Sequence, residues 1–328
     1  MIRLIFPEEN AVVSLKTPIQ NEFEKNIEAN AEVSGWCTRE SNEFGKCTFP
    51  APVHFMWESD SADNLFTLSD TKDFSSVIYS GKYDSECDVY NLFLGKTYYW
   101  KVGDSEIRSF TVDHSTPRWI FAEGTWNVRD IGGYVNADGK MIKQGLIYRG
   151  AELDGFAEGR VITDAGRKVL HDDLGIQFDL DLRDKTEASA THSPIGDDIG
   201  YIRISSESYG EFIGWKSNTK KFLSLLTDRK NYPIYIHCAV GADRTGSLLA
   251  IICGLLRMTE KDMTEDYEQS TLAFPDGNRS RHVWTFEALM KQLEPYGDNF
   301  LDRVYNYVIS CGITAEEIET IRKIMTEE

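Results

Sequence analysis

The stretch that decides the fold of this 328-residue chain is His237-Cys-Ala-Val-Gly-Ala-Asp-Arg-Thr-Gly246. An apolar run, residues 233–236, precedes it, and a second apolar run of helical character, residues 247–256, follows it. This order predicts a strand, a tight loop and a helix N-terminus, which together aim backbone N–H groups at one point. Five residues separate Cys238 from Arg244. The loop can therefore curl until the sulfur lies at its floor and the guanidinium at its rim.

The residue types of this loop suit the transfer of a phosphoryl group. Only a thiolate is a good nucleophile, and helix N-terminal amides with a nearby guanidinium stabilise it. Arg244 offers a planar fork that bonds two phosphoryl oxygens at once. We expect the Thr245 hydroxyl to donate to the sulfur and His237 to order the loop. The residues expected to cradle the phosphoryl group are Ala239, Val240, Gly241, Ala242, Thr245 and Gly246.

Working outward, the chain from about residue 116 alternates strand-like and helical patterns. This alternation predicts an α/β domain with a largely parallel central sheet, followed by a helical C-terminal cover. Gly312 is expected to end one helix, and a capping box starting at Thr314 to begin the last. Strands are predicted at residues 146–148, 176–182, 201–204 and 233–237, and helices at 163–173 and 215–227.

The chain before residue 116 has a different texture, with short alternating or aromatic-rich runs separated by turn residues. Such spacing predicts an all-β immunoglobulin- or fibronectin-like sandwich, so we divide the chain into residues 1–115 and 116–328. The aromatic side chains of this sandwich fit a core, although such modules also present aromatics to sugars or proteins. The predicted strands are residues 53–57, 65–68, 77–79, 89–93, 97–102 and 106–112.

The second half also resembles a known family. His-Cys-x5-Arg-Thr-Gly is similar to the signature of the protein tyrosine phosphatase superfamily. Residues 127–134 resemble an Asn-Phe-Arg-Asp-Leu-Gly-Gly segment of a microbial branch, which would imply a bacterial source. That branch includes the secreted mycobacterial tyrosine/lipid phosphatase. Further similar segments lie at residues 148–151, 181–187 and 266–270, so the resemblance spans roughly residues 120–325.

The resemblance implies that the general acid is Asp243, inside the loop, since the chain has no Trp-Pro-Asp segment. An Asp beside a phosphate site can be held protonated by its surroundings. The alternative is a plain helix-capping or dipole role for this carboxylate. Ala242 stands where the mycobacterial relatives carry Lys, which leaves Arg244 as the loop's one basic residue. This difference counts against lipid phosphatase activity.

Four residues outside the loop are candidates for supporting or binding roles. Asp181 is predicted to end a central strand near the site, where ligands of open α/β sheets collect. It is therefore a candidate for binding substrate, with a structural bond to Arg183 as the alternative. Asn127, Arg129 and Asp130 are expected to support the site by fixing a turn and an ion pair.

Composition limits the partners of this chain. A formal net charge of −18 argues against binding nucleic acid or an anionic membrane through a broad basic surface. We expect no transmembrane segment, because no apolar run approaches the length that a spanning helix needs. The short apolar start does not resemble a signal peptide, which favours a cytoplasmic location unless a leader has been removed. The six cysteines lack metal-site spacing, and pairing of Cys37 with Cys47 stays open.

These features predict a cysteine-dependent phosphatase that needs no metal or organic cofactor. Its expected partners are phosphorylated proteins or small phosphate esters, with phosphotyrosine preferred because the loop offers one cradle and little other positive charge. Lys220, Lys221 or Arg281 would favour a lipid substrate if they folded over the pocket. The alternatives are an inositol phosphate or phosphoinositide phosphatase, a silent module that binds phosphorylated ligands, and an adhesive sandwich with the phosphatase as passenger. No prediction is made of the oligomeric state.

Overall fold

The structure, a computed structural model, describes residues 2–29, 36, 45–60, 64–156, 160–188, 190–273 and 278–328. The chain forms two compact units. The first unit comprises Met1–Thr17 and Pro50–Arg118, and the second comprises Pro18–Phe49 and Trp119–Glu328. Among the described residues, no helix has both the length and the apolar character that crossing a bilayer requires.

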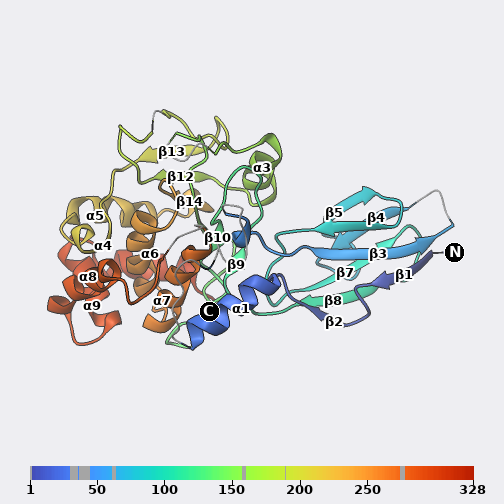
Figure 1. The fold of residues 1–328 in the computed structure, drawn as a ribbon, viewed down its shortest axis with the longest axis horizontal. Coiled ribbons are helices and arrows are strands. Elements are labelled where there is room, and N and C mark those ends of the chain that lie inside the picture. The colour runs from blue at the N-terminus through green and yellow to red at the C-terminus, as the bar shows by residue number, and fades with distance from the viewer. Residues whose placement is uncertain are drawn as a thin grey trace. The chain divides into compact units, whose positions relative to one another are not determined.

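The first unit is built from two β-sheets (Figure 1). One sheet has three antiparallel strands in the order β1-β3-β6, and the other has five in the order β2-β8-β7-β4-β5. All pairs in the larger sheet are antiparallel except β2 with β8. The strands are β1 (Ile2–Phe6), β2 (Ala11–Val13), β3 (Val53–Ser59), β4 (Leu65–Ser69), β5 (Val77–Lys82), β6 (Glu86–Val89), β7 (Thr97–Val102) and β8 (Arg108–Val112).

Alternate side chains of both sheets fill one aromatic core. Strand β3 buries Phe55 and β7 buries Trp100, and their rings meet edge to face at 5.2 Å between centroids. Every second side chain of a strand points to the same face of its sheet, so the core lies between the two sheets. This layered all-β arrangement agrees with the predicted sandwich, while its likeness to immunoglobulin or fibronectin modules stays a prediction. The strand predicted at residues 89–93 lies earlier in the chain, because β6 ends at Val89. Asn91 takes a left-handed φ of 66°, which strand pairing does not allow.

The second unit contains a six-stranded sheet in the order β13-β12-β14-β11-β10-β9. Strands β13 to β11 are parallel, and β10 pairs antiparallel with β11. Strand β14, which leads into the loop of residues 237–246, is flanked on both sides by parallel strands. The strands are β9 (Arg118–Trp119), β10 (Arg129–Asp130), β11 (Ile147–Gly150), β12 (Phe178–Asp181), β13 (Gly200–Arg203) and β14 (Ile234–His237).

Helices cover both faces of this sheet. Ile234 and Ile236 point to the face packed by the C-terminal helices, and Tyr235 points to the opposite face, whose cluster includes Leu170 of the π-helical turn after α3. Figure 1 shows α3 apart from the group of α4 to α9. The helices are α3 (Asp164–Lys168), α4 (Tyr209–Phe212), α5 (Lys216–Leu225), α6 (Asp243–Leu255), α7 (Glu260–Gln269), α8 (Trp284–Leu293), α9 (Phe300–Ser310) and α10 (Ala315–Met325). The short turns are η1 (Lys46–Thr48), η2 (Val169–Asp173), η3 (Arg229–Asn231), η4 (Ser270–Ala273) and η5 (Glu294–Tyr296).

The helix ends follow the sequence signals. Gly312, with a φ of 88°, lies just beyond α9, where a left-handed residue ends a helix. The Thr314 hydroxyl accepts from the Glu317 N–H, and the Glu317 carboxylate accepts from the Thr314 N–H. The predicted capping box at the start of α10 is therefore confirmed.

Residues 18–49 depart from the predicted division at residue 115, because they belong to the second unit. Helix α1 (Pro18–Glu28) buries Phe23 and Ile27 in a cluster that includes Trp119 and Leu272. The signal was present in the sequence: an apolar residue every fourth position from Ile19, with Pro18 at the first helical position. Cys37 lies outside the described residues, so its pairing with Cys47 stays a prediction.

Candidate active site

The loop between β14 and α6 turns its carbonyl groups outward, toward the surrounding scaffold. Backbone and side-chain N–H groups of three neighbours bond these carbonyls and hold the loop in its curl. The bonds are Glu152 N to Ala239 O at 3.0 Å, Asn127 Nδ2 to Val240 O at 3.0 Å, and Arg149 Nη2 to Gly241 O at 2.8 Å.

The N–H groups of the same loop are left for a ligand. The structure shows no hydrogen bond from the N–H groups of residues 239–245 to any other described residue. The C=O and N–H of a peptide unit point in opposite directions, so outward carbonyls leave the N–H groups facing the inside of the curl. Cys238 lies at the start of this curl and is 1% exposed. The loop is thus an anion cradle with a sulfur at its base.

Close packing beneath the loop explains its glycine. Gly241 has a φ of 69°, and a Cβ added there would stand 2.2 Å from the carbonyl oxygen of Gly150. Only glycine fits such a combination of left-handed backbone and contact with another main chain. The carboxyl end of β11 therefore shapes the floor of the cradle.

Arg244 is held at the rim by Glu187. Its two terminal nitrogens bond the two carboxylate oxygens of Glu187, one pair at 2.8 Å. Burial would lower the pKa of Arg244, but the bond to Glu187 and the charge of Cys238 outweigh burial and raise it. Glu187 thus fixes the plane of the guanidinium before a ligand arrives.

Asp243, the first residue of α6, is the centre of a second polar group. Arg279 Nε lies 2.6 Å from one of its carboxylate oxygens, and Arg279 Nη2 donates to the other at 3.0 Å. The Tyr209 hydroxyl also donates to Asp243, and it lies 3.0 Å from the hydroxyl of Tyr267. Burial, with the neighbouring acidic groups, raises the pKa of both tyrosines, so both hydroxyls keep their protons at neutral pH.

His237 lies beneath the loop among buried acids. Its Nε2 is 3.1 Å from Asp179 Oδ1, and its Nδ1 is 3.2 Å from the carbonyl oxygen of Cys238. Burial would lower its pKa, but the charges of Asp181 and Asp179 outweigh burial and raise the pKa to about 9. The imidazole therefore carries a positive charge at neutral pH, beside the main-chain carbonyl of Cys238.

A buried charged layer supports the cradle. Asp266 of α7 pairs with Arg129 at 2.8 Å and with Arg149 at 2.7 Å. Burial alone would raise the pKa of Asp266, but the two guanidinium groups hold it below its ordinary value. Arg129 also donates to Asn127 Oδ1 at 2.6 Å. The predicted supporting residues Asn127 and Arg129 thus connect to the loop, through the Asn127–Val240 bond.

Two predicted contacts, those of Asp181 and Thr245, differ from the structure, and a third residue, Asp130, takes its predicted supporting place. Asp181 is fully buried, and its carboxylate holds Arg183 and the Tyr201 hydroxyl, so the geometry supports the structural alternative over substrate binding. Asp130 accepts from the backbone N–H groups of Gly132 at 2.8 Å and Gly145 at 2.6 Å, so it fixes a turn, as predicted. The buried Thr245 hydroxyl makes no hydrogen bond to any described residue, the Cys238 sulfur included.

The basic residue that the structure places beside Asp243 is none of the three that the sequence suggested. Arg281 pairs with Glu268 at 2.6 Å, and Lys221 lies 3.5 Å from Asn218 on its own helix. Lys220 lies beside Gly312. Arg279 is the residue that reaches Asp243, and no sequence signal marks it, because the contact spans 36 residues.

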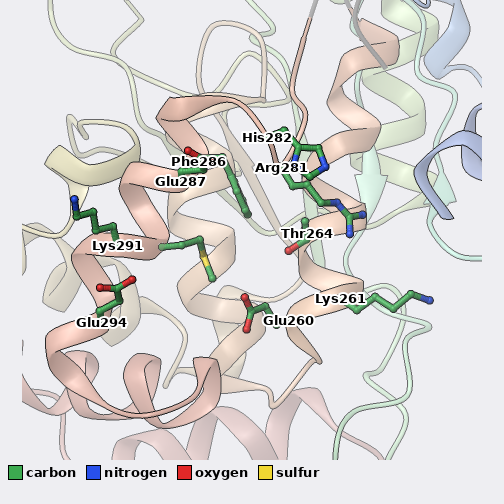
Figure 2. Close-up of a pocket in the computed structure, with 10 residues that line it drawn as sticks. Glu260, Lys261, Thr264, Arg281, His282, Phe286, Glu287, Lys291 and Glu294 are labelled. Atoms are coloured by element: carbon green, nitrogen blue, oxygen red, sulfur yellow. The ribbon is translucent and has the colours of Figure 1, made fainter. Parts of the chain in front are cut away.

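A cavity of about 630 Å³ opens between α7 and α8 (Figure 2). Its walls mix acidic and basic side chains with Phe286 and Met290, and none of its lining residues belongs to the loop. Phe286 stacks on Tyr267 at 4.6 Å between ring centroids. The cavity therefore lies behind the tyrosine pair rather than in the cradle. It is lined by Glu260, Lys261, Thr264, Arg281, His282, Phe286, Glu287, Met290, Lys291 and Glu294.

Comparisons with known proteins cover the second unit. No curated protein sequence matches the chain. Among solved structures, the core catalytic domain of the PP-IP phosphatase SIW14 from S. cerevisiae, in complex with citrate, aligns with 54% of this chain and 93% of its own, at 19% identity and a TM-score of 0.35. The profile of the tyrosine phosphatase family matches residues 120–327, which include the loop, Glu187 and Arg279. With this match over more than half of its length, the chain belongs to the tyrosine phosphatase family.

Proposed function

We propose that this chain is a cysteine-dependent phosphatase that hydrolyses phosphate monoesters, with protein phosphotyrosine as its substrate. One observation carries the proposal: the loop turns its carbonyls outward to the scaffold and leaves its N–H groups around Cys238 without a partner among the described residues. Such a cradle binds a phosphoryl group, and Arg244 at its rim bonds two of the oxygens.

In the first step the Cys238 thiolate attacks phosphorus. An S–P bond forms as the bond from phosphorus to the leaving oxygen breaks, and the leaving oxygen takes a proton from Asp243. The loop N–H groups and Arg244 stabilise the charge on the remaining oxygens. The positive His237 stabilises the resting thiolate from behind.

In the second step water attacks the phosphocysteine. An O–P bond forms, the S–P bond breaks, and the proton of the water passes to the Asp243 carboxylate. The products are inorganic phosphate and the Cys238 thiolate. Asp243 then carries the proton needed for the next first step. The Arg279 Nε lies 2.6 Å from this carboxylate.

Two properties support phosphotyrosine as the substrate. The loop side chains Ala239, Val240 and Ala242 carry no charge, and the whole chain has a net charge of −18, which opposes highly charged ligands. The second candidate is an inositol phosphate or phosphoinositide phosphatase. Arg279, which adds a cation beside Asp243, is the observation that favours it. A cytoplasmic location stays a prediction.

The test is turnover of 4-nitrophenyl phosphate by the full chain and by Cys238→Ser. We expect Cys238→Ser to lose turnover while keeping its affinity for phosphorylated ligands, because the loop N–H groups and Arg244 remain. Vanadate should inhibit the wild type, and EDTA should not. Turnover by Cys238→Ser, or loss of wild-type activity on chelation, would contradict a thiol mechanism. Binding of phosphorylated ligands without any wild-type turnover would favour a silent module.

A further inference from the structure

Thr48, in η1, contacts the scaffold of the loop from a distant part of the chain. It is 1% exposed, and its Oγ1 accepts from the Asn127 N–H at 3.0 Å. The same hydroxyl donates its one hydrogen to the carbonyl oxygen of Gly45 at 2.6 Å. Because that hydrogen is used, a lone pair of the oxygen faces Asn127. The contact spans 79 residues, and Thr48 lies outside residues 120–327, so the family match does not include it.

Asn127 connects this contact to the loop. Its Nδ2 donates to the carbonyl oxygen of Val240 at 3.0 Å, and its Oδ1 accepts from Arg129 Nη1 at 2.6 Å. Asn127 is fully buried and has a left-handed φ of 56°, a conformation that its surroundings must support. Among the described residues, its N–H donates to Thr48 Oγ1 alone. Thr48 therefore fixes the backbone from which the Asn127 amide reaches the loop.

The peptide unit between Val240 and Gly241 depends on this connection. A peptide unit is planar, so the direction of the Val240 C=O also sets the direction of the Gly241 N–H on its opposite side. The Gly241 N–H is one of the loop N–H groups that make no hydrogen bond to a described residue. A valine in place of Thr48 would leave the buried Asn127 N–H without its acceptor, and that cost favours a shift of Asn127. The Gly241 N–H would then lose its aim at a bound anion.

Two further contacts hold Thr48 in place. The side-chain amide of Gln20, in α1, donates to the main-chain carbonyl oxygens on either side of Thr48, at 3.0 and 3.1 Å. Gly45 has a φ of 80°, and a Cβ added there would stand 2.9 Å from the Cβ of Trp126. The hydroxyl is therefore set in position by packing and hydrogen bonds of its own segment, as a group that orients another must be.

We propose that Thr48 is a positioning residue for the loop, which acts through Asn127 on the peptide unit between Val240 and Gly241. The inference rests on the proposed function and extends its site to residues 45–49. In this role Thr48 does not touch the substrate, because it sets the direction of an N–H group that does.

Removal of the hydroxyl tests the inference. Thr48→Val deletes the acceptor at almost unchanged volume, and we expect kcat/KM on 4-nitrophenyl phosphate to fall by roughly 10- to 100-fold. The inhibition constant of tungstate, a tetrahedral dianion, should rise with it, because the cradle loses an aligned N–H group. Only active molecules report this constant, so it does not depend on the folded fraction. Thr48→Ser keeps the hydroxyl and should restore most of the activity and of the tungstate affinity.

Thr219→Val is the matched control. Thr219, in α5, is also fully buried in the second unit, and its hydroxyl lies 3.0 Å from the hydroxyl of Tyr307 in α9. We expect Thr219→Val to lower the unfolding temperature and to leave the inhibition constant of tungstate unchanged. A wild-type constant in Thr48→Val, equal damage in Thr48→Ser and Thr48→Val, or the same rise in Thr219→Val would overturn the inference.

A measurement on the wild type needs neither turnover nor a variant that folds. Coupling between two sites is reciprocal, so tungstate in the cradle should stabilise η1. Two hydrogen bonds within this segment, Thr48 N to Gly45 O and Phe49 N to Lys46 O, report its opening through amide hydrogen exchange. We expect saturating tungstate to slow exchange in peptides that cover residues 45–49. If the wild type binds tungstate without hydrolysing 4-nitrophenyl phosphate, the proposed function fails, and the exchange still tests Thr48. Unchanged exchange at residues 45–49 would refute its role.

Discussion

At the scale of the residue, the proposed mechanism assigns to Asp243 the proton that the leaving oxygen needs. Asp243→Asn keeps the shape and the hydroxyl contact with Tyr209 but cannot give up a proton. We expect a loss of about 10²- to 10⁴-fold in kcat on phenyl phosphate. On 4-nitrophenyl phosphate the loss should be small, because 4-nitrophenolate departs without protonation. Steady-state kinetics on the two esters measures the difference. Equal losses on both would make Asp243 a structural residue.

His237 should make the free energy of unfolding depend on pH. Its pKa of about 9 in the folded chain lies above the ordinary value of about 6.5. A group with a raised folded pKa contributes stability that is complete below its unfolded pKa and is lost as pH rises through the folded one. The free energy of unfolding should therefore fall by about 3 kcal/mol between pH 6.5 and 9.5.

Urea unfolding at several pH values measures this fall. His237→Gln should abolish it. His54→Gln is the control, because His54 lies on β3 of the first unit, where it pairs with the exposed carboxylate of Asp88. An unfolding free energy that is constant over this pH range in the wild type would show that His237 is not charged in the fold.

At the scale of the element, the curl between β14 and α6 depends on one backbone contact. Gly241→Ala adds a Cβ only 2.2 Å from the Gly150 carbonyl oxygen, so the loop must open. We expect kcat/KM on 4-nitrophenyl phosphate to fall by at least about 100-fold, because the N–H groups lose their common focus. Gly139→Ala is the control: Gly139 has a similar φ of 76° but nothing within 4 Å of an added Cβ. It should keep activity within about twofold, since only backbone strain changes. Retained activity in Gly241→Ala would contradict the role given to this contact.

At the scale of the whole molecule, the two units alternate along the chain, so residues 18–49 of the second unit are separated from residues 119–328 by most of the first. Residues 119–328 alone lack α1 and the stretch at residues 45–49. That stretch includes Thr48, and the Thr48 hydroxyl accepts from the Asn127 N–H at 3.0 Å. They would also expose Trp119 and Leu272. We expect a chain of residues 18–49 joined to 119–328 by a short Gly/Ser linker to fold and hydrolyse 4-nitrophenyl phosphate.

Residues 119–328 without that segment should unfold at a clearly lower temperature, because each buried aromatic or leucine side chain that becomes exposed costs about 1.5–3 kcal/mol. Thermal unfolding followed by circular dichroism, with activity at 25 °C, compares the two chains. Equal unfolding temperatures would mean that α1 is not part of the second unit's core.

Local sequence determined the elements whose signals lie within a few residues of one another. The strand, loop and helix around Cys238 follow from a buried apolar run, a glycine-containing turn and a second apolar run. The capping box at Thr314 is likewise a contact between residues three apart. Alternating side chains on β3 and β7 predicted a layered all-β unit for the same reason. In each case the pattern that predicts the element lies within a few consecutive residues.

Tertiary structure decided what depends on contacts between distant residues. Arg279 meets Asp243 across 36 residues, and Asp266 meets Arg149 across 117. Helix α1 joins the second unit by packing on Trp119, although an all-β unit separates them in the chain. The sequence by itself therefore determined that a cysteine and an arginine share one tight loop between a strand and a helix. Only the folded chain decided which charges surround that loop, because a long-range ion pair leaves no periodic or local pattern in the sequence.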